Sequence, residues 1–310
     1  MSKSVLCIGA TLIDELYFCE STIVVGSSNP AQKSMSIGGV ISNIVQNLAL
    51  LDVNVSLITA LGNDGDAQFI SKNFEKMGIG YSQSIVANDS TGKYVSILNS
   101  DGNLYISACQ DISSKYITIP FLESKVNFIK DFDLIVIDTN LETKTIQWVI
   151  NFSKMHNKTL IIEPVSVTKA SKLAHLNLDG VYMITPNEEE LISISTIEVG
   201  KEETLIDNLY KRGVAKIWIR KGDQGSVIHH NGKPTYLSVP KIGITDSTGA
   251  GDAALAGWIF GYVNNEEELT SLQLGHSLAL EILKIKGSVN LTINKENLYK
   301  IKKTYYNESK

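Results

Sequence analysis

Short apolar runs alternate with amphipathic segments of helical length along most of the 310-residue chain. The apolar runs are nearly continuous, which predicts strands that are buried on both faces of a parallel sheet. The predicted strands are 5–10, 55–62, 133–138, 160–165, 181–186 and 216–222. The predicted helices between them include 40–51, 64–77, 142–155, 187–194 and 202–212. This order predicts right-handed βαβ units in a doubly wound α/β fold, with residues 1–310 as one domain.

Two segments, 15–37 and 91–110, interrupt this alternation with short strand patterns and polar turns. The second segment contains Asp101-Gly102, a dipeptide typical of tight hairpins. We expect the two segments to pair into one small sheet that forms a lid over a site on the core. The alternative is an ordinary extension of the main sheet at its edge.

Composition narrows the class of protein. Hydrophobic residues make up 43% and charged residues 20% of the chain, as in ordinary globular proteins. A net charge of −5 argues against a nucleic-acid partner. The three cysteines form no CxxC pair, which indicates a reducing compartment. With neither a signal-peptide pattern nor an apolar run of the roughly 18 residues that a membrane span needs, we expect a cytoplasmic protein with no membrane partner.

Polar residues gather where the predicted strands end. Ligands of open α/β sheets bind beyond the carboxyl ends of the strands. The residues at these ends are Asp14, Asn140, Glu163-Pro164, Asn187 and Gly222.

The segment "DSTGAGD" (246–252) contains the most specific chemistry. Gly249, Ala250 and Gly251 at the start of a helix would expose unpaired N–H groups at the positive end of the helix dipole, which suits a phosphate. Asp252 would repel that phosphate, so we expect it to take a proton from a hydroxyl group that attacks the phosphorus. The alternative is a simple helix-capping acid, but a cap does not need three small residues. The pattern therefore predicts phosphoryl transfer to an alcohol.

Four motifs in this order resemble those of the phosphofructokinase-B or ribokinase family of carbohydrate and nucleoside kinases. They are "GGVISNIVQNLALL" (38–51), "PNEEE" (186–190), "KGDQG" (221–225) and "DSTGAGD". The resemblance implies a ribokinase-like fold, a doubly wound and mostly parallel sheet flanked by helices, with a small β-sheet lid. It also implies ATP as phosphate donor and a homodimer formed through the lid.

The same resemblance assigns roles around the phosphate. It places the catalytic base at Asp252 and the anion hole at the backbone of Gly249, Ala250 and Gly251. The nucleotide is expected to contact Gly249 and Gly251 as well.

Two further assignments concern metal ions. Asn187 and Glu190 match the pair that holds Mg²⁺ and phosphate through water, although Glu190 could also lie on a solvated helix face. Asp246 and Thr248 match residues that help to bind a monovalent cation such as K⁺, and an Asx turn is the alternative.

The nucleotide is expected at Asn187 and Thr248 and at the turn formed by Lys221, Gly222 and Gly225. That Gly-x-x-Gly turn could also be a plain hairpin. Lys221 stands where many relatives have a small hydroxyl residue.

On the acceptor side, the resemblance implies that Asp14, Gly38, Gly39 and Asn43 bind the hydroxyl groups of a sugar. For Asp14 the alternative is a turn residue. Ribokinases usually carry a lysine after the two glycines, and here it is Val40, which argues against free ribose.

A finer resemblance is to pseudouridine kinases. It covers "SSNPAQKSMSIGGVISNIVQNLALL" (27–51), "DTNL" (138–141) and "EPVSVTK" (163–169), with Ser42 in place of an arginine and Glu163 in place of an aspartate. A uracil ring joined through carbon exposes an extra N–H, which an asparagine amide can bind. Asn29 and Asn140 are the candidates for contact with the base or the sugar.

The leading hypothesis is an ATP-dependent kinase that phosphorylates the 5′-hydroxyl of pseudouridine. The first alternative is a related kinase for another nucleoside or sugar, such as ribose or a ketohexose. The second is a nucleoside or nucleotide sensor without catalysis, which would have no need of Asp252.

Overall fold

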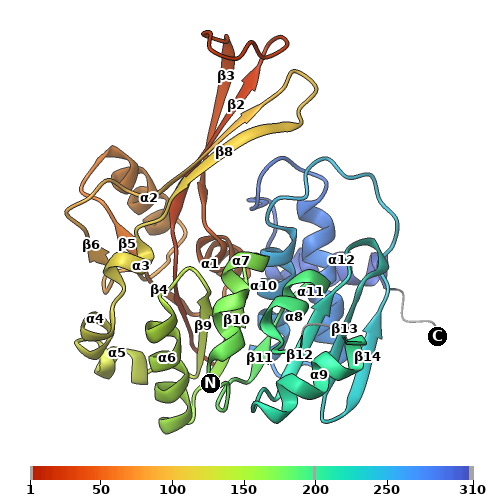
Figure 1. The fold of residues 1–310 in the computed structure, drawn as a ribbon. Helices are drawn as coiled ribbons and strands as arrows, with labels where there is room; N and C mark the ends of the chain where they lie inside the picture. The colour runs from red at the N-terminus through yellow and green to blue at the C-terminus, as the bar shows by residue number, and fades with distance from the viewer. Residues whose placement is uncertain (1–2, 198–199, 307–310) are drawn as a thin grey trace.

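An eight-stranded sheet forms the centre of the molecule, seen in a computed structural model that describes residues 3–197 and 200–306 (Figure 1). Its strands run in the order β14-β13-β12-β11-β10-β9-β1-β4. The pairs from β12 to β4 are parallel, and β13 and β14 extend the sheet antiparallel. The strands are β1 (Val5–Ile8), β4 (Val55–Ile58), β9 (Leu134–Asp138), β10 (Thr159–Glu163), β11 (Met183–Ile184), β12 (Lys216–Arg220), β13 (Ser226–His230) and β14 (Lys233–Leu237).

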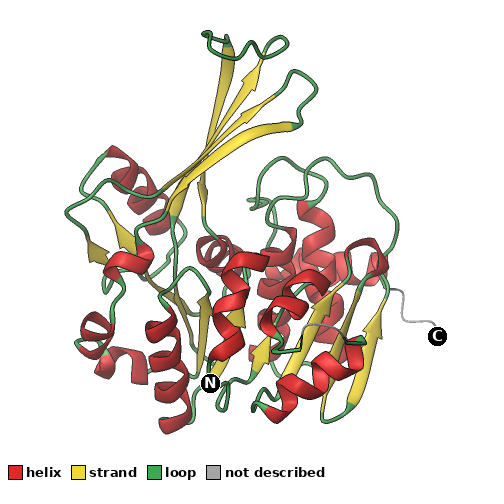
Figure 2. Cartoon of the chain, viewed as in Figure 1, coloured by secondary structure: helices red, strands yellow, loops and turns green. Residues whose placement is uncertain are grey.

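Helices cover both faces of this sheet (Figure 2). Alternate strand residues face opposite layers, as a pleated strand requires: Val5 and Cys7 pack into one apolar cluster, and Leu6 and Ile8 into the other. The first cluster holds residues of α1 (Val40–Leu50), α2 (Gly65–Lys76), α10 (Ala250–Val263), α11 (Glu268–Ile282) and α12 (Lys295–Tyr305). The second holds residues of α4 (Ile119–Glu123), α5 (Val126–Lys130), α6 (Thr143–Met155), α8 (Glu188–Ile194) and α9 (Glu202–Lys211).

The structure confirms the doubly wound α/β fold and finds each predicted strand and helix, with some boundaries moved. The predicted strand 55–62 divides into β4 and a separate β5 (Ala60–Leu61), which pairs with β6 (Ile85–Val86) in a small sheet of its own. The predicted strand 181–186 is reduced to the two residues of β11. Among the described residues, every helix is too short or too polar to cross a lipid bilayer.

A second, four-stranded sheet projects from the main body (Figure 1) and is called the lid sheet below. Its order is β3-β2-β7-β8, with β2 (Leu12–Cys19), β3 (Ala31–Gly38), β7 (Lys93–Leu98) and β8 (Leu104–Gln110). The two predicted excursions therefore pair with each other, through parallel β2 and β7, and do not extend the main sheet. The Asp101-Gly102 turn connects β7 to β8, with Gly102 at φ 85°.

Helix α10 is buried along most of its length, including every residue from Asp252 to Gly261. It crosses α11 at very short range, because a Cβ on Gly257 would lie 2.7 Å from the carbonyl oxygen of Leu274. On α11, a Cβ on Gly275 would lie 2.5 Å from the carbonyl oxygen of Ala254. A helix that is apolar all round must be enclosed in this way, and the small residues allow the close approach. The turn that precedes α10 is thus carried by a firmly packed element.

Candidate active site

The glycine turn before α10 has the geometry of an anion site. Gly249 is the N-cap with a left-handed φ of 74°, and a Cβ there would lie only 2.3 Å from the Cβ of Ser288. The Ala250 N–H donates to the carbonyl oxygen of Ser247 at 3.3 Å. In the described part of the chain, the N–H groups of Gly251 and Asp252 have no acceptor. The turn therefore presents free donors at the positive end of a helix, as phosphate binding requires.

Asp252 lies beside these donors and is nearly enclosed, with 9% of the residue exposed. The amide nitrogen Nδ2 of Asn43 donates to its Oδ2 at 2.8 Å, and the Ser288 hydroxyl donates to Oδ1 of Asn43 at 2.8 Å. Burial raises the pKa of Asp252 to about 7 and the negative charge of Glu163 adds to the increase, while Asn43 and Arg220 oppose it. A carboxyl group that titrates near neutral pH is well matched to a general base.

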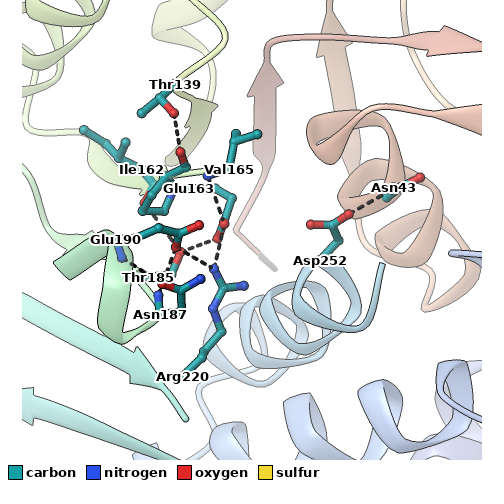
Figure 3. A network of polar contacts seen from close by, with 11 residues as sticks. Asn43, Thr139, Ile162, Glu163, Val165, Thr185, Asn187, Glu190, Arg220 and Asp252 are labelled. Carbon is teal, nitrogen blue, oxygen red and sulfur yellow. Dashed lines mark hydrogen bonds and ion pairs between the residues drawn. The ribbon is translucent and has the colours of Figure 1, made fainter. Parts of the chain in front are cut away.

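A partly buried ion pair stands opposite Asp252 and Asn43 in the site (Figure 3). The Arg220 guanidinium donates from Nη2 to Oε1 of Glu163 at 2.7 Å, and the Thr185 hydroxyl donates to Oε2 of the same carboxylate. Glu190 lies 4.0 Å from the same Nη2. These side chains come from the carboxyl ends of neighbouring strands and from the start of α8. The sequence reasoning assigned Arg220 no role in the site. It noted Glu163 as a residue at a strand end and as a departure from the subfamily pattern.

Asn187 and Glu190 form a reciprocal cap at the start of α8. The Glu190 N–H donates to Oδ1 of Asn187 at 2.8 Å, and the Asn187 N–H donates to Oε2 of Glu190 at 2.9 Å. Glu190 is only 4% exposed, and burial raises its pKa, so it does not lie on a solvated face as Glu188 and Glu189 do.

The chemistry of this pair fits Mg²⁺ held through water. One carboxylate and one amide supply oxygen ligands, and Mg²⁺ keeps several waters and takes few carboxylates. The described residues contain no group of three His, Cys, Asp or Glu that could hold a metal alone. Water and substrate phosphate would therefore have to complete the shell.

The Gly-x-x-Gly turn connects β12 to β13. Gly225 has φ 91°, and a Cβ there would lie 2.1 Å from the carbonyl oxygen of Leu237, so packing on β14 already requires a glycine. Gly222, with φ 57°, faces open space. The Lys221 ammonium is engaged by Glu202 at 2.5 Å and Glu188 at 3.8 Å. Contact between Lys221 and a phosphate thus stays a prediction.

Asp246 and Thr248 form an Asx turn. Oδ1 of Asp246 accepts the N–H of Thr248 at 2.9 Å and its hydroxyl at 2.7 Å, and Oδ2 accepts the N–H of Gly287 at 3.1 Å. The alternative of a self-supported turn is therefore present in the structure. These oxygens already have donors, and binding of a monovalent cation at these residues stays a prediction.

The predicted acceptor residues Asp14, Gly38 and Gly39 lie together where β2 meets β3. A Cβ on Gly38 would lie 2.2 Å from a carboxylate oxygen of Asp14, and one on Gly39, at φ 96°, would lie 2.5 Å from the carbonyl oxygen of Ala10. Burial raises the pKa of Asp14 to about 6. Gly39 is the N-cap of α1. One turn further along the same helix lies Asn43, whose amide donates to Asp252, so α1 connects the predicted acceptor residues to the predicted base.

Asn140 belongs to a polar group at the end of β9 that also contains Asp138 and Lys169. Nδ2 of Asn140 donates to Asp138 at 2.7 Å, its N–H donates to the same carboxylate at 3.0 Å, and Lys169 donates to its Oδ1. The sequence reasoning quoted Asp138 and Lys169 within motifs without assigning either a role.

Asn29 is not brought into either group. It lies in the loop between β2 and β3, at the end of the lid sheet that points away from the main body (Figure 1). Its side chain closes this loop, accepting from the Val24 N–H at 2.8 Å and donating to the carbonyls of Val24 and Ser27. Its contact with a substrate stays a prediction. Ser42 is fully buried on α1 and bonded to Gln46, so it does not replace the polar contact that an arginine would make.

A helix start with free N–H groups, a buried carboxyl group beside it and the predicted acceptor residues near that carboxyl are the arrangement expected of a phosphotransferase that acts on a hydroxyl group. The family comparison agrees, because the profile of the pfkB family carbohydrate kinases matches residues 2–294. The chain belongs to the pfkB family, and it is a sugar or nucleoside kinase of the ribokinase type.

Curated relatives and solved structures agree with this assignment. A pseudouridine kinase of Escherichia coli is 27% identical over 83% of this chain and 84% of its own length. A ribokinase of Staphylococcus aureus is 25% identical over 84% of this chain and 86% of its own. The structure of Arabidopsis thaliana ribokinase complexed with ribose and ATP superposes with a TM-score of 0.83 at 19% identity, over 98% of this chain and 99% of that one. The last likeness establishes the ribokinase fold.

Proposed function

We propose that the protein transfers the γ-phosphoryl group of ATP to the 5′-hydroxyl of pseudouridine, giving pseudouridine 5′-phosphate and ADP. The observation that carries the transfer chemistry is the buried Asp252 beside the free N–H groups of the glycine turn. The similarity to a pseudouridine kinase, at 27% identity, supports the choice of acceptor.

In the proposed reaction, Asp252 takes the proton of the 5′-hydroxyl as its oxygen attacks the γ-phosphorus. A new P–O bond forms, the bond to the β-phosphate oxygen breaks, and ADP leaves with the electron pair. The N–H groups of Gly251 and Asp252 stabilise the charge on the transferring group. Mg²⁺, held through water at Asn187 and Glu190, would neutralise phosphate charge.

The polar group at the end of β9 supports a nucleoside acceptor. The Lys169 ammonium is a donor suited to a uracil carbonyl, and the amide of Asn140 offers a donor and an acceptor in one plane. The Lys169 ammonium and the Asn140 amide can bind a ligand if that ligand replaces the hydrogen bond between them. Asn140 itself is only 6% exposed, so a base would have to displace Lys169 to reach it.

We further propose that the lid sheet closes over the acceptor and excludes water from the reaction. Leu104, Tyr105 and Ile106 on its edge strand β8 are 55%, 49% and 57% exposed. Apolar side chains on an open edge strand support the proposal that two copies pair through their lids.

The second candidate is a kinase for another sugar or nucleoside, such as ribose or a ketohexose. It is favoured by the comparable similarity to a ribokinase, at 25% identity. Val40, where ribokinases usually carry a lysine, argues against ribose itself. A sensor without catalysis is disfavoured by the intact Asp252 and glycine turn.

The test is to incubate the purified protein with ATP and Mg²⁺ and, separately, pseudouridine, uridine, ribose and fructose, following ADP release and product mass. Selective phosphorylation of pseudouridine supports the proposal. Faster turnover of uridine or a sugar would keep the kinase chemistry and reject pseudouridine. The Asp252→Asn variant serves as the inactive control for contaminating kinases.

A further inference from the structure

The Arg220 guanidinium lies directly against the glycine turn. An ideal Cβ on Gly251 would lie 2.5 Å from Nη1 and 3.4 Å from Cζ of Arg220. The guanidinium therefore occupies the space that any side chain at position 251 would need. The Arg220 side chain is 18% exposed, so a ligand at the turn can reach part of it.

Only one edge of this guanidinium is held. Nη2 donates to Glu163 at 2.7 Å, whereas Nη1, the atom beside Gly251, has no hydrogen-bond acceptor among residues 3–197 and 200–306. A guanidinium carries five N–H donors and keeps its charge at every physiological pH. Arg220 thus offers unused donors next to the unpaired N–H groups of the turn.

Glu163 is itself firmly positioned. Besides Arg220 and the Thr185 hydroxyl, its carboxylate accepts a long hydrogen bond of 3.4 Å from the N–H of Val165. Val165 has a φ of 69°, a left-handed conformation that is strained for a β-branched residue. Such strain persists only where the surrounding contacts impose it, and it concentrates at functional sites.

Three acidic side chains surround Arg220. Asp252, Glu163 and Glu190 are three carboxyl groups whose charges all act on Arg220. Without its positive charge, these carboxylates would repel the triphosphate of the nucleotide and the phosphoryl group in transfer.

We propose that Arg220 binds the transferring phosphoryl group through the free Nη1 edge of its guanidinium, and that Glu163 is the residue that positions it. This inference rests on the proposed phosphotransfer and adds a side-chain cation to the backbone donors. Arg220 stabilises the charge spread over the phosphoryl oxygens. Glu163 acts on that group through Arg220, apart from its part in raising the pKa of Asp252.

The experiment compares Arg220→Met, Arg220→Lys, Glu163→Gln and the double variant with the wild type, using the fastest acceptor of the panel. We expect Arg220→Met to lower kcat by about 10²-fold or more, with a much smaller change in the KM of the acceptor. Arg220→Lys keeps the charge but loses the fork geometry, and it should recover part of the rate. Added guanidinium chloride at low concentration should partly restore kcat to Arg220→Met alone.

Two comparisons separate this role from a structural one. On the alkaline plateau of the pH profile, where Asp252 is ionised in every variant, Glu163→Gln should lower kcat less than Arg220→Met does. The double variant should there be no slower than Arg220→Met, because Glu163 acts on the phosphoryl group through Arg220. The double variant removes both charges of the pair and so keeps the test possible if a single variant unfolds. Arg212→Lys is the matched control, since the hydrogen bonds of the Arg212 guanidinium within the described residues go to the backbone carbonyls of Leu173, Leu176 and Ile194. It should change the melting temperature without changing kcat.

A wild-type kcat in a folded Arg220→Met or double variant would overturn the inference and leave the proposed function standing. If the wild type phosphorylates no acceptor, the proposed function falls, and the affinity for ADP with aluminium fluoride and Mg²⁺ decides the inference. Arg220→Met should weaken binding of that transition-state mimic at least about tenfold while ADP alone changes little. Equal losses for both ligands would overturn the inference.

Discussion

Replacing Asp252 with asparagine should impair activity and stabilise the protein at the same time. The variant keeps the size of the side chain and the hydrogen-bond partner Asn43, which can donate to the new amide oxygen. It removes the base, so kcat should fall by about 10²–10⁴-fold while binding of the acceptor survives. Asp179→Asn, at an exposed surface ion pair with Lys154, is the matched control.

The gain in stability follows from the pKa of the buried carboxyl group. The pKa of Asp252 is raised from 3.8 to about 7 in the folded protein, because burial disfavours its charged form. The unfolded chain therefore loses this proton at lower pH than the folded protein does, and the wild type loses stability as pH rises between the two values. A displacement of this size corresponds to at most about 4 kcal/mol above pH 7 and to nearly nothing below pH 4.

The assay is denaturant unfolding of wild type and Asp252→Asn at several pH values, with kinetics on the same samples. The difference in the free energy of unfolding should grow by about 1.4 kcal/mol per pH unit between pH 4 and pH 7 and then level off. A constant difference across this range would refute the reasoning, because it would mean that Asp252 titrates alike in the folded and unfolded chains.

Three further predictions concern the same site. The kcat/KM of the acceptor should fall as pH drops below about 7, since only the ionised Asp252 accepts a proton, and a flat profile from pH 5 to 8 would argue against this base. Asn43→Asp places a second carboxyl group against Asp252, so this acidic limb should move to higher pH by about one unit; an unmoved limb would contradict the contact. Gly249→Ala should cost more than the about 1–2 kcal/mol of a left-handed alanine, because its Cβ would meet Ser288. Gly78→Ala, with φ 70° and open space around it, measures the backbone cost alone, and equal melting temperatures would contradict the clash.

The hydrophobic pattern was sufficient to predict the parallel part of the main sheet, because buried parallel strands are apolar on both faces. It could not predict where strands end, since hydrogen bonding to neighbours decides this, as in the two-residue β11. For the lid sheet, the sequence predicted that segments 15–37 and 91–110 would pair, but it did not predict that β2 would be the strand that pairs with β7. The antiparallel β13 and β14 were not predicted as strands.

Some residues of the site could be predicted from the sequence and others could not. Asp252 and its glycine turn could be predicted because the residues that act together are adjacent in the chain. The pair of Glu163 and Arg220 could not, because 57 positions separate two side chains that meet only at the ends of β10 and β12. The available signals were Glu163 at the end of one predicted strand and an arginine at the end of another, "KIWIR". The ion pairs of Lys221 could not be predicted either, since its partners Glu188 and Glu202 lie on α8 and α9.

The close crossing of α10 and α11 affects how mutational scans of this protein should be interpreted. Gly257 and Gly275 contact backbone atoms of the opposite helix, and Gly261 lies against Ser271 in the same way. Substitutions there would push the two helices apart and carry the glycine turn with them. A scan scored by growth or turnover would therefore rank these buried glycines with Asp252, although their neighbours are atoms of the opposite helix. Sensitivity along α10 would report on helix spacing, and abundance measured alongside activity would tell the two causes apart.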